Sequence, residues 1–84
     1  MLFKVEMTVN IPPGFPANEA EEIKQREKAY SQQLQREGKW RHIWRVAGLY
    51  ANVSTFAVQA GEELHQILMG LPLYHFMALK VEAL

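Results

Sequence analysis

The sequence predicts an α+β fold in which four strands and two helices follow one another in the order β-α-β-β-α-β. Two observations support this prediction. The hydrophobic pattern alternates along the chain between a period of two residues, typical of a half-buried strand, and a period of three to four residues, typical of an amphipathic helix. Glycines and prolines stand where the period changes, as expected for turns and helix ends.

The first half of the chain reads as a strand followed by a long helix. Residues 2–10 alternate strictly, and their apolar face consists of Phe3, Val5, Met7 and Val9. The prolines and glycine of residues 11–16 interrupt any regular structure. Asn18 and Glu21 have the spacing of a capping box, so we expect a helix from Asn18 to about Glu37, where Gly38 ends it.

The second half repeats the pattern with an additional strand. Residues 39–47 alternate, which places Trp40, His42 and Trp44 on one strand face and Arg41, Ile43 and Arg45 on the other. Residues 50–58 read as a third strand. A second helix begins near Glu62, ends at Gly70 and Pro72, and buries Leu64, Ile67, Leu68 and Leu71. Residues 73–84 read as a fourth strand with His75 on its more apolar side.

This order is the split βαβ pattern of ferredoxin-like folds, so residues 1–84 are expected to form one domain. Both helices should cover one face of a four-stranded antiparallel sheet and leave the other face open. An open face that carries Trp40 and Trp44 would favour a homo-oligomer, because large exposed apolar patches usually mark an interface. The alternative is that both tryptophans complete the core beneath the helices.

The composition excludes several classes of function. Nine lysines and arginines balance nine acidic residues, so no net charge attracts nucleic acid or an anionic membrane. The chain has no cysteine for a disulfide, a thiolate nucleophile or a zinc site. Its three histidines lack metal-ligand spacing, and no phosphate-binding or dinucleotide-binding motif occurs, so we expect neither metal nor cofactor. With no signal peptide or membrane span apparent in the sequence, a cytoplasmic protein is expected.

The first predicted helix carries a carboxylate within its apolar stripe. Glu27 fills the middle turn of a stripe formed by Ala20, Ile23, Tyr30 and Leu34. Burial of an ionised carboxylate is unfavourable unless the group is paired or its pKa rises. A raised pKa suits a carboxylate that takes up and returns a proton at neutral pH, which makes Glu27 a candidate general base. The alternative is a side chain at the edge of the stripe that reaches water or a basic neighbour.

Polar side chains on the central strands could serve such a base. Arg41 and Arg45 are expected on the same face of one strand and could bind a substrate carboxylate. The alternative is that both are solvent-exposed charges at the rim of the sheet. Tyr50 and Asn52 share a face of the next strand and could donate hydrogen bonds to a developing oxyanion. These residues together favour cofactor-free proton transfer on a small acid.

Three blocks of the sequence, MLFKVEMTVNIP, LQREGKWRHIWRVAGLYANVSTFAV and LHQILMGLPLYHFM, closely resemble the muconolactone isomerases of the catechol branch of the β-ketoadipate pathway. The resemblance extends over nearly the whole chain, and its most specific part is QREGKWRHIWRVAGLYAN. It implies a ferredoxin-like subunit of a ring-like homo-oligomer, a decamer in the family, with active sites at subunit contacts. It also implies conversion of (+)-muconolactone into the 3-oxoadipate enol-lactone without a cofactor.

The resemblance assigns roles to the candidate residues. Glu27 is the proton-shuttling base, and Lys28 stands beside it as in the Glu-Lys pair of the family, either stabilising charge or solvated. Tyr50 and Asn52 are the donors to a dienolate. The carboxylate anchor is Arg45 together with Arg41. Side chains expected to form walls of the substrate site are Trp40 and His42.

The chain departs from the family pattern at three places. Leu49 stands where members carry a basic residue, and His75 with Phe76 replaces a proline-tyrosine pair. Members also continue beyond the position of Leu84 with a polar, histidine-containing tail. These differences leave two alternatives open: a dehalogenase or isomerase acting on a chloromuconolactone or related lactone, and a non-catalytic module that binds a small ligand or only assembles.

Overall fold

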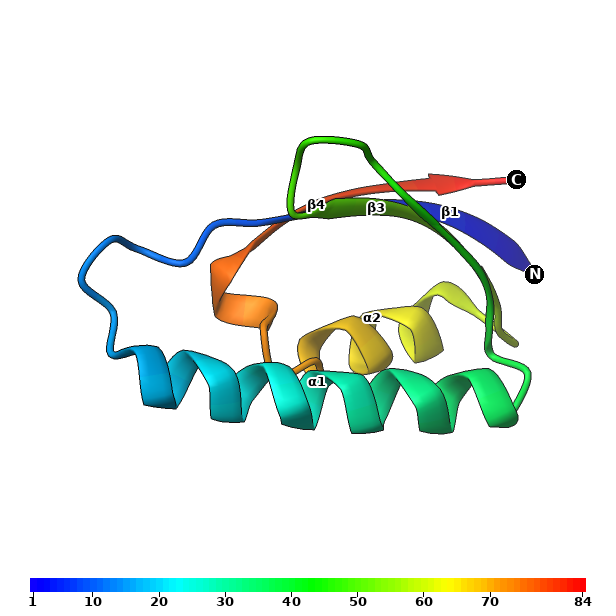
Figure 1. Cartoon of the computed structure of the whole chain (residues 1–84). Coiled ribbons are helices and arrows are strands. Elements are labelled where there is room, and N and C mark those ends of the chain that lie inside the picture. The colour runs from blue at the N-terminus through cyan, green and yellow to red at the C-terminus, as the bar shows by residue number, and fades with distance from the viewer.

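The computed structural model describes all 84 residues as two layers, a four-stranded sheet and two helices that both lie on one of its faces (Figure 1). The strands, all antiparallel to their neighbours, lie in the order β2-β3-β1-β4. In chain order the elements are β1 (Leu2–Val9), α1 (Ala17–Arg36), β2 (Trp40–Arg45), β3 (Ala51–Ala57), α2 (Gly61–Met69), the 3-10 helix η1 (Tyr74–Phe76) and β4 (Met77–Ala83). This order and topology confirm the predicted ferredoxin-like fold.

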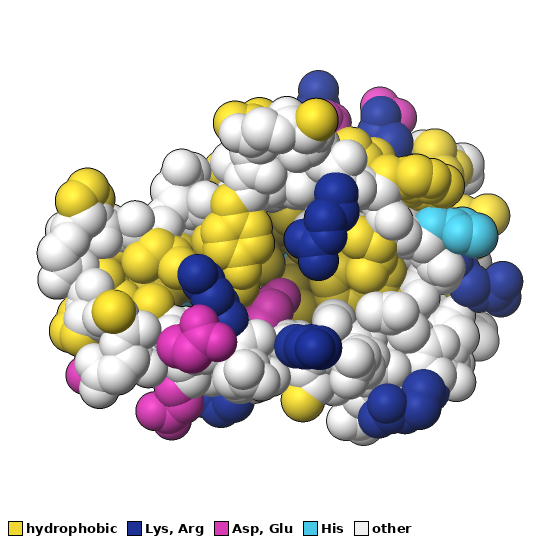
Figure 2. Space-filling view, in the orientation of Figure 1, with side chains coloured by type: hydrophobic (Ala, Val, Ile, Leu, Met, Phe, Trp, Pro, Cys, Tyr) yellow, Lys and Arg dark blue, Asp and Glu magenta, His cyan; other side chains and the backbone are white.

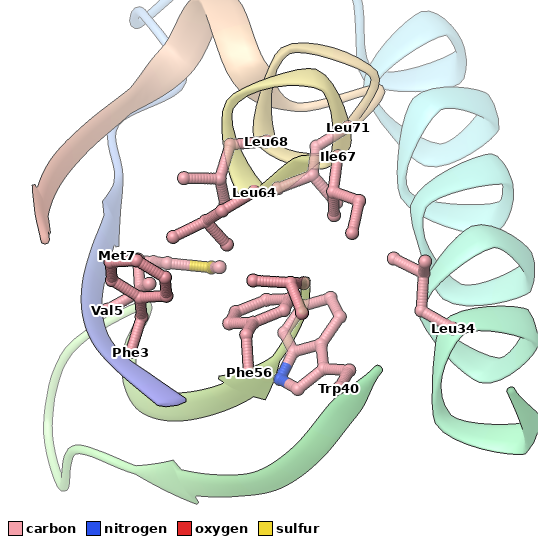
Figure 3. Close-up of a cluster of buried hydrophobic side chains, with 11 residues drawn as sticks. Phe3, Val5, Met7, Leu34, Trp40, Phe56, Leu64, Ile67, Leu68 and Leu71 are labelled. Atoms are coloured by element: carbon pink, nitrogen blue, oxygen red, sulfur yellow. The ribbon is translucent and has the colours of Figure 1, made fainter. Parts of the chain in front are cut away.

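Eleven buried apolar side chains form the core between the two layers (Figure 3). The inward-facing side chains of β1 and the apolar stripe of α2, both predicted from the sequence, supply most of them together with the Phe56 ring of β3. From α1, by contrast, only Leu34 is buried. The second helix therefore packs on the sheet along its length, whereas most of α1 stands away from the core.

The ends of α1 differ in how well the sequence predicts them. At the C-terminal end, Gly38 has a φ of 76°, so the predicted left-handed residue after the helix is confirmed. The capping box is wrong, because the helix begins at Ala17 without a side-chain cap. The Pro16 carbonyl accepts the first helical hydrogen bond, from the Ala20 amide at 3.0 Å. Asn18 consequently lies inside the first turn, where it cannot act as the N-cap residue.

A β-bulge in β2 overturns the predicted alternation of that strand. Trp40 pairs with Phe56, but the next pair along the ladder joins His42 to Thr55, so Arg41 is the extra residue. Beyond the bulge every side chain changes face. Trp40 is therefore only 3% exposed within the core, whereas Trp44 is 54% exposed on the outer face. Neither sequence interpretation holds for both tryptophans, since one completes the core and the other lies on the open face.

The segment between α2 and β4 also differs from the prediction. Residues 74–76 form η1, and β4 begins only at Met77. The prediction that His75 lies on the fourth strand is therefore wrong, and its side chain is exposed. Leu73 precedes this turn and is almost completely buried. No helix has both the length and the apolar character that crossing a bilayer requires.

Candidate active site

A cleft of about 450 Å³ lies where α1 stands away from the sheet. Figure 2 shows this face hollowed between the two layers, with an acidic side chain inside the hollow and basic side chains around it. The cleft is lined from α1, from the inward side of the sheet and from the segment that leads into β4. The lining residues are Val9, Lys24, Glu27, Lys28, Ser31, Gln32, Gln35, Trp40, Ile43, Arg45, Tyr50, Asn52, Leu73 and Met77.

Glu27 projects from the middle of α1 into this cleft. Its Oε1 atom accepts a hydrogen bond of 3.0 Å from the backbone amide of Leu73. Burial raises the pKa of the Glu27 carboxyl above its usual value of 4.5, and the Leu73 amide opposes this rise only in part. The bond uses one carboxylate oxygen and fixes the direction of the group, so the second oxygen is available to a bound molecule.

The bulge in β2 brings the polar residues of the central strands to the same cleft. Because the register changes after Arg41, Arg45 pairs with Asn52 of β3, and both side chains line the cleft. The Oδ1 atom of Asn52 accepts a hydrogen bond of 2.6 Å from the Ser54 hydroxyl. A carbonyl oxygen engaged in this way leaves the NH₂ group of Asn52 as the part of the side chain that can donate elsewhere.

Tyr50 closes one side of the cleft from the β2–β3 loop. Burial raises the pKa of its phenol, the Glu27 carboxylate raises it further, and Arg45 lowers it. The phenol consequently stays protonated at neutral pH and can donate a hydrogen bond. Lys24 lies across the cleft with its Nζ atom 5.4 Å from the centre of the Tyr50 ring, within the range of a cation–π contact.

Two of the predicted substrate-binding residues lie outside the cleft. Arg41 is the bulged residue, and its Nε atom donates a hydrogen bond of 2.8 Å to the Gly38 carbonyl. The prediction that Arg41 and Arg45 share a strand face is therefore wrong. His42 occupies the outer face of the sheet, where its ring stacks on Trp44 with 5.3 Å between centroids. The predicted wall residue Trp40 does line the cleft.

The positions at which the resemblance predicts a departure from the family also lie away from the cleft. Leu49 is 65% exposed in the β2–β3 loop and does not line the hollow. Phe76 packs edge-on against Phe15, with 5.3 Å between ring centroids, and neither it nor His75 contributes to the cleft. None of these three side chains therefore lines the cleft that contains Glu27.

Comparison with known proteins matches the whole chain to one family. The family model of muconolactone delta-isomerase spans residues 1–84. The chain belongs to the muconolactone delta-isomerase family.

Named members of the muconolactone delta-isomerase family are similar throughout. The muconolactone delta-isomerase of Acinetobacter baylyi is 58% identical over 84 residues, which is all of this chain and 88% of that protein. The enzyme of Cupriavidus pinatubonensis is 54% identical over all of this chain and 91% of its own length. A crystal structure of muconolactone isomerase superposes with a TM-score of 0.95 at 50% identity, covering all of this chain and 88% of the other.

The structure adds residues to the site that the sequence analysis of this muconolactone delta-isomerase family member did not identify. Lys24 precedes Lys28 by one helical turn, so the i, i+4 spacing along α1 could have placed it on the cleft side. Leu73 could not have been found in this way. It is 46 residues from Glu27 in the sequence, and its contribution is a backbone amide that any residue except proline would carry.

Proposed function

We propose that this chain catalyses the isomerisation of (+)-muconolactone to the 3-oxoadipate enol-lactone by proton transfer between two ring carbons. The observation that carries the proposal is the Glu27 carboxylate, which is partly buried in a cleft and accepts a hydrogen bond from the Leu73 amide. The family membership and the names of the relatives support the choice of substrate.

In the first step Glu27 removes the proton from the ring carbon that carries the acetate arm. The electron pair of the broken C–H bond moves through the ring double bond onto the lactone carbonyl oxygen, which gives a dienolate. Glu27 then returns the proton to the carbon next to the carbonyl, so the double bond has moved and no atom is gained or lost. The raised pKa of Glu27 suits this exchange, because the carboxyl must both accept and release the proton.

The negative charge of the dienolate requires hydrogen-bond donors. The NH₂ group of Asn52 and the phenol of Tyr50 are two neutral donors among the residues that line the cleft with Glu27. Donors oriented before the reaction stabilise the developing charge without the reorganisation that water would require. Lys28, next to Glu27 on α1, adds a positive charge to the same cleft.

The acetate arm of the lactone requires a cation, and Arg45 is the proposed anchor. Arg45 makes no ion pair with any carboxylate of the chain, so its guanidinium is available to a substrate carboxylate. Lys24 supplies a second positive charge at the cleft. Arg41 and His42, which lie elsewhere, are not assigned a role in substrate binding.

The test is to follow ultraviolet absorbance of the purified protein with (+)-muconolactone and, separately, with its chloro analogue. We expect turnover of muconolactone without any added cofactor. Chloride release from the analogue at the higher kcat/KM would instead favour the dehalogenase. An absence of turnover with either lactone would refute the proposed activity and favour a non-catalytic module.

We also propose that the chain forms a homo-oligomer in the cytoplasm. Trp44 is exposed on the outer face of the sheet, and the loop after β2 exposes the apolar side chains Val46 and Leu49. A patch of this kind in so small a protein favours burial against another copy. Light scattering that gives the mass of a single 9.7 kDa chain at micromolar concentration would contradict this proposal. The decamer implied by the family resemblance stays a prediction.

A further inference from the structure

Ser54 is the only polar residue among the buried residues of the chain. It lies on the inward face of β3, two positions from Asn52, and has no exposed surface. Its hydroxyl donates a hydrogen bond of 2.6 Å to Oδ1 of Asn52, the only side-chain hydrogen bond that Ser54 makes. The neighbouring inward position of the same strand, Phe56, is equally buried and apolar. Burial alone therefore does not explain why position 54 carries a hydroxyl.

The hydrogen bond distinguishes the two ends of the Asn52 amide. In the observed orientation Oδ1 accepts the Ser54 hydroxyl proton, and both N–H groups remain for the cleft. If the amide flipped, its NH₂ group would face Ser54, and the buried hydroxyl proton would have no acceptor. The flipped amide would also present an oxygen lone pair to the cleft, where the proposed reaction develops negative charge.

We propose that Ser54 is a positioning residue that holds the Asn52 amide with its NH₂ group toward the lactone. This inference rests on the proposed function, because it assigns Asn52 the task of donating to the dienolate oxygen. Ser54 itself does not line the cleft, so it would act on a bound lactone only through Asn52. Its hydrogen bond disfavours the flipped amide of Asn52, whose oxygen would face the cleft and repel the developing negative charge.

The first test compares Ser54→Ala, Asn52→Ala and the double variant by steady-state kinetics. Loss of an oxyanion donor lowers kcat by about 10² to 10³, so Asn52→Ala should fall in that range. Ser54→Ala keeps the amide but frees its orientation, so we expect a smaller decrease of about tenfold in kcat, with KM unchanged. In the Asn52→Ala background the Ser54 substitution should have no further effect, because no amide remains to orient.

The matched control is Thr55→Val on the same strand. The Thr55 hydroxyl is also buried but has no hydrogen-bond partner, and it faces the outer side of the sheet. Its removal should leave kcat and KM unchanged. Ser54→Cys, which keeps a weak donor at nearly the same volume, should lie between the parent and Ser54→Ala, and it serves as the test if the alanine variant does not fold.

A second measurement separates this inference from the proposed function. In isotope-labelled protein, the two side-chain N–H signals of Asn52, assigned by their loss in Asn52→Ala, should shift and exchange faster with solvent in Ser54→Ala. This result is independent of any substrate. If the parent does not turn over muconolactone but the signals respond as expected, the proposed function fails and the orienting contact stands. Unchanged signals, or effects of the two substitutions on kcat that add in the double variant, would overturn the inference.

Discussion

Replacement of Glu27 by Gln is the sharpest test of the chemistry, because it removes the ionisable group and little else. Glutamine has the same length as glutamate, and its carbonyl oxygen can accept the 3.0 Å hydrogen bond from the Leu73 amide. The cleft should therefore keep its shape. What is lost is the ability to accept a proton, so the expected result is a loss of activity without a loss of structure.

The magnitude of the loss follows from the role of the group. A positioned general base contributes about 10² to 10⁴ in rate, so kcat of Glu27→Gln should fall by at least about a hundredfold. The free energy of unfolding should change in the opposite direction. Since burial raises the pKa of Glu27 above 4.5 in the folded state, ionisation lowers the stability of the parent as the pH rises through this range. At pH 7 the variant should therefore be at least as stable as the parent, and the difference should disappear below about pH 4.

Ultraviolet absorbance of muconolactone measures the first effect, and urea denaturation at pH 7 and pH 4 measures the second. Glu22→Gln is the matched control, since Glu22 lies on the same helix but on its exposed side. It should leave both quantities nearly unchanged. If Glu27→Gln turned over muconolactone at the rate of the parent, the assignment of Glu27 as the base would be refuted.

Three further predictions concern the anchor, the pH profile and the packing of α1. Arg45→Gln should raise KM by about ten- to a hundredfold, because the substrate carboxylate loses a charged hydrogen bond. Arg41→Gln should leave KM unchanged. Equal effects of the two substitutions would contradict the assignment of Arg45 as the carboxylate anchor. The rising limb of kcat/KM with pH should have its midpoint above 4.5, since Glu27 must be ionised to act, and a midpoint at or below 4.5 would argue against it. Gly70→Ala places a Cβ atom 2.8 Å from the Tyr30 hydroxyl and should lower the free energy of unfolding by about 1–3 kcal/mol. Urea denaturation should show that the double variant with Tyr30→Phe recovers part of this loss. If the double variant recovered none of it, the strain would not come from the Tyr30 hydroxyl.

The fold was largely predictable because local patterns determine it. The alternation of β1, the apolar stripe of α2 and the glycine after α1 each have a local physical cause, and the structure confirms all three. The first turn of α1 was mispredicted because two local signals compete there. The helix begins at Ala17 with Pro16 in the N-cap position, two residues before the N-cap that Asn18 and Glu21 suggest.

The site was predictable only in part, because it depends on contacts between distant segments. The carboxylate of Glu27 could be recognised as misplaced in an apolar stripe, but its partner Leu73 could not. The bulge at Arg41 has no sequence signature, and a single inserted residue exchanges the two faces of the strand after it. For this reason the strand pattern grouped Arg41 with Arg45, whereas the folded chain places only Arg45 in the cleft.

The unequal packing of α1 has a consequence for how such a protein can change over evolutionary time. The helix contains 20 residues, yet Leu34 near its C-terminal end is its only buried anchor. Substitutions in the preceding turns, around Lys24 and Lys28, should therefore have little effect on folding while altering the electrostatics and shape that a ligand meets. New ligand preferences could accumulate along those turns without bringing the chain closer to its stability threshold.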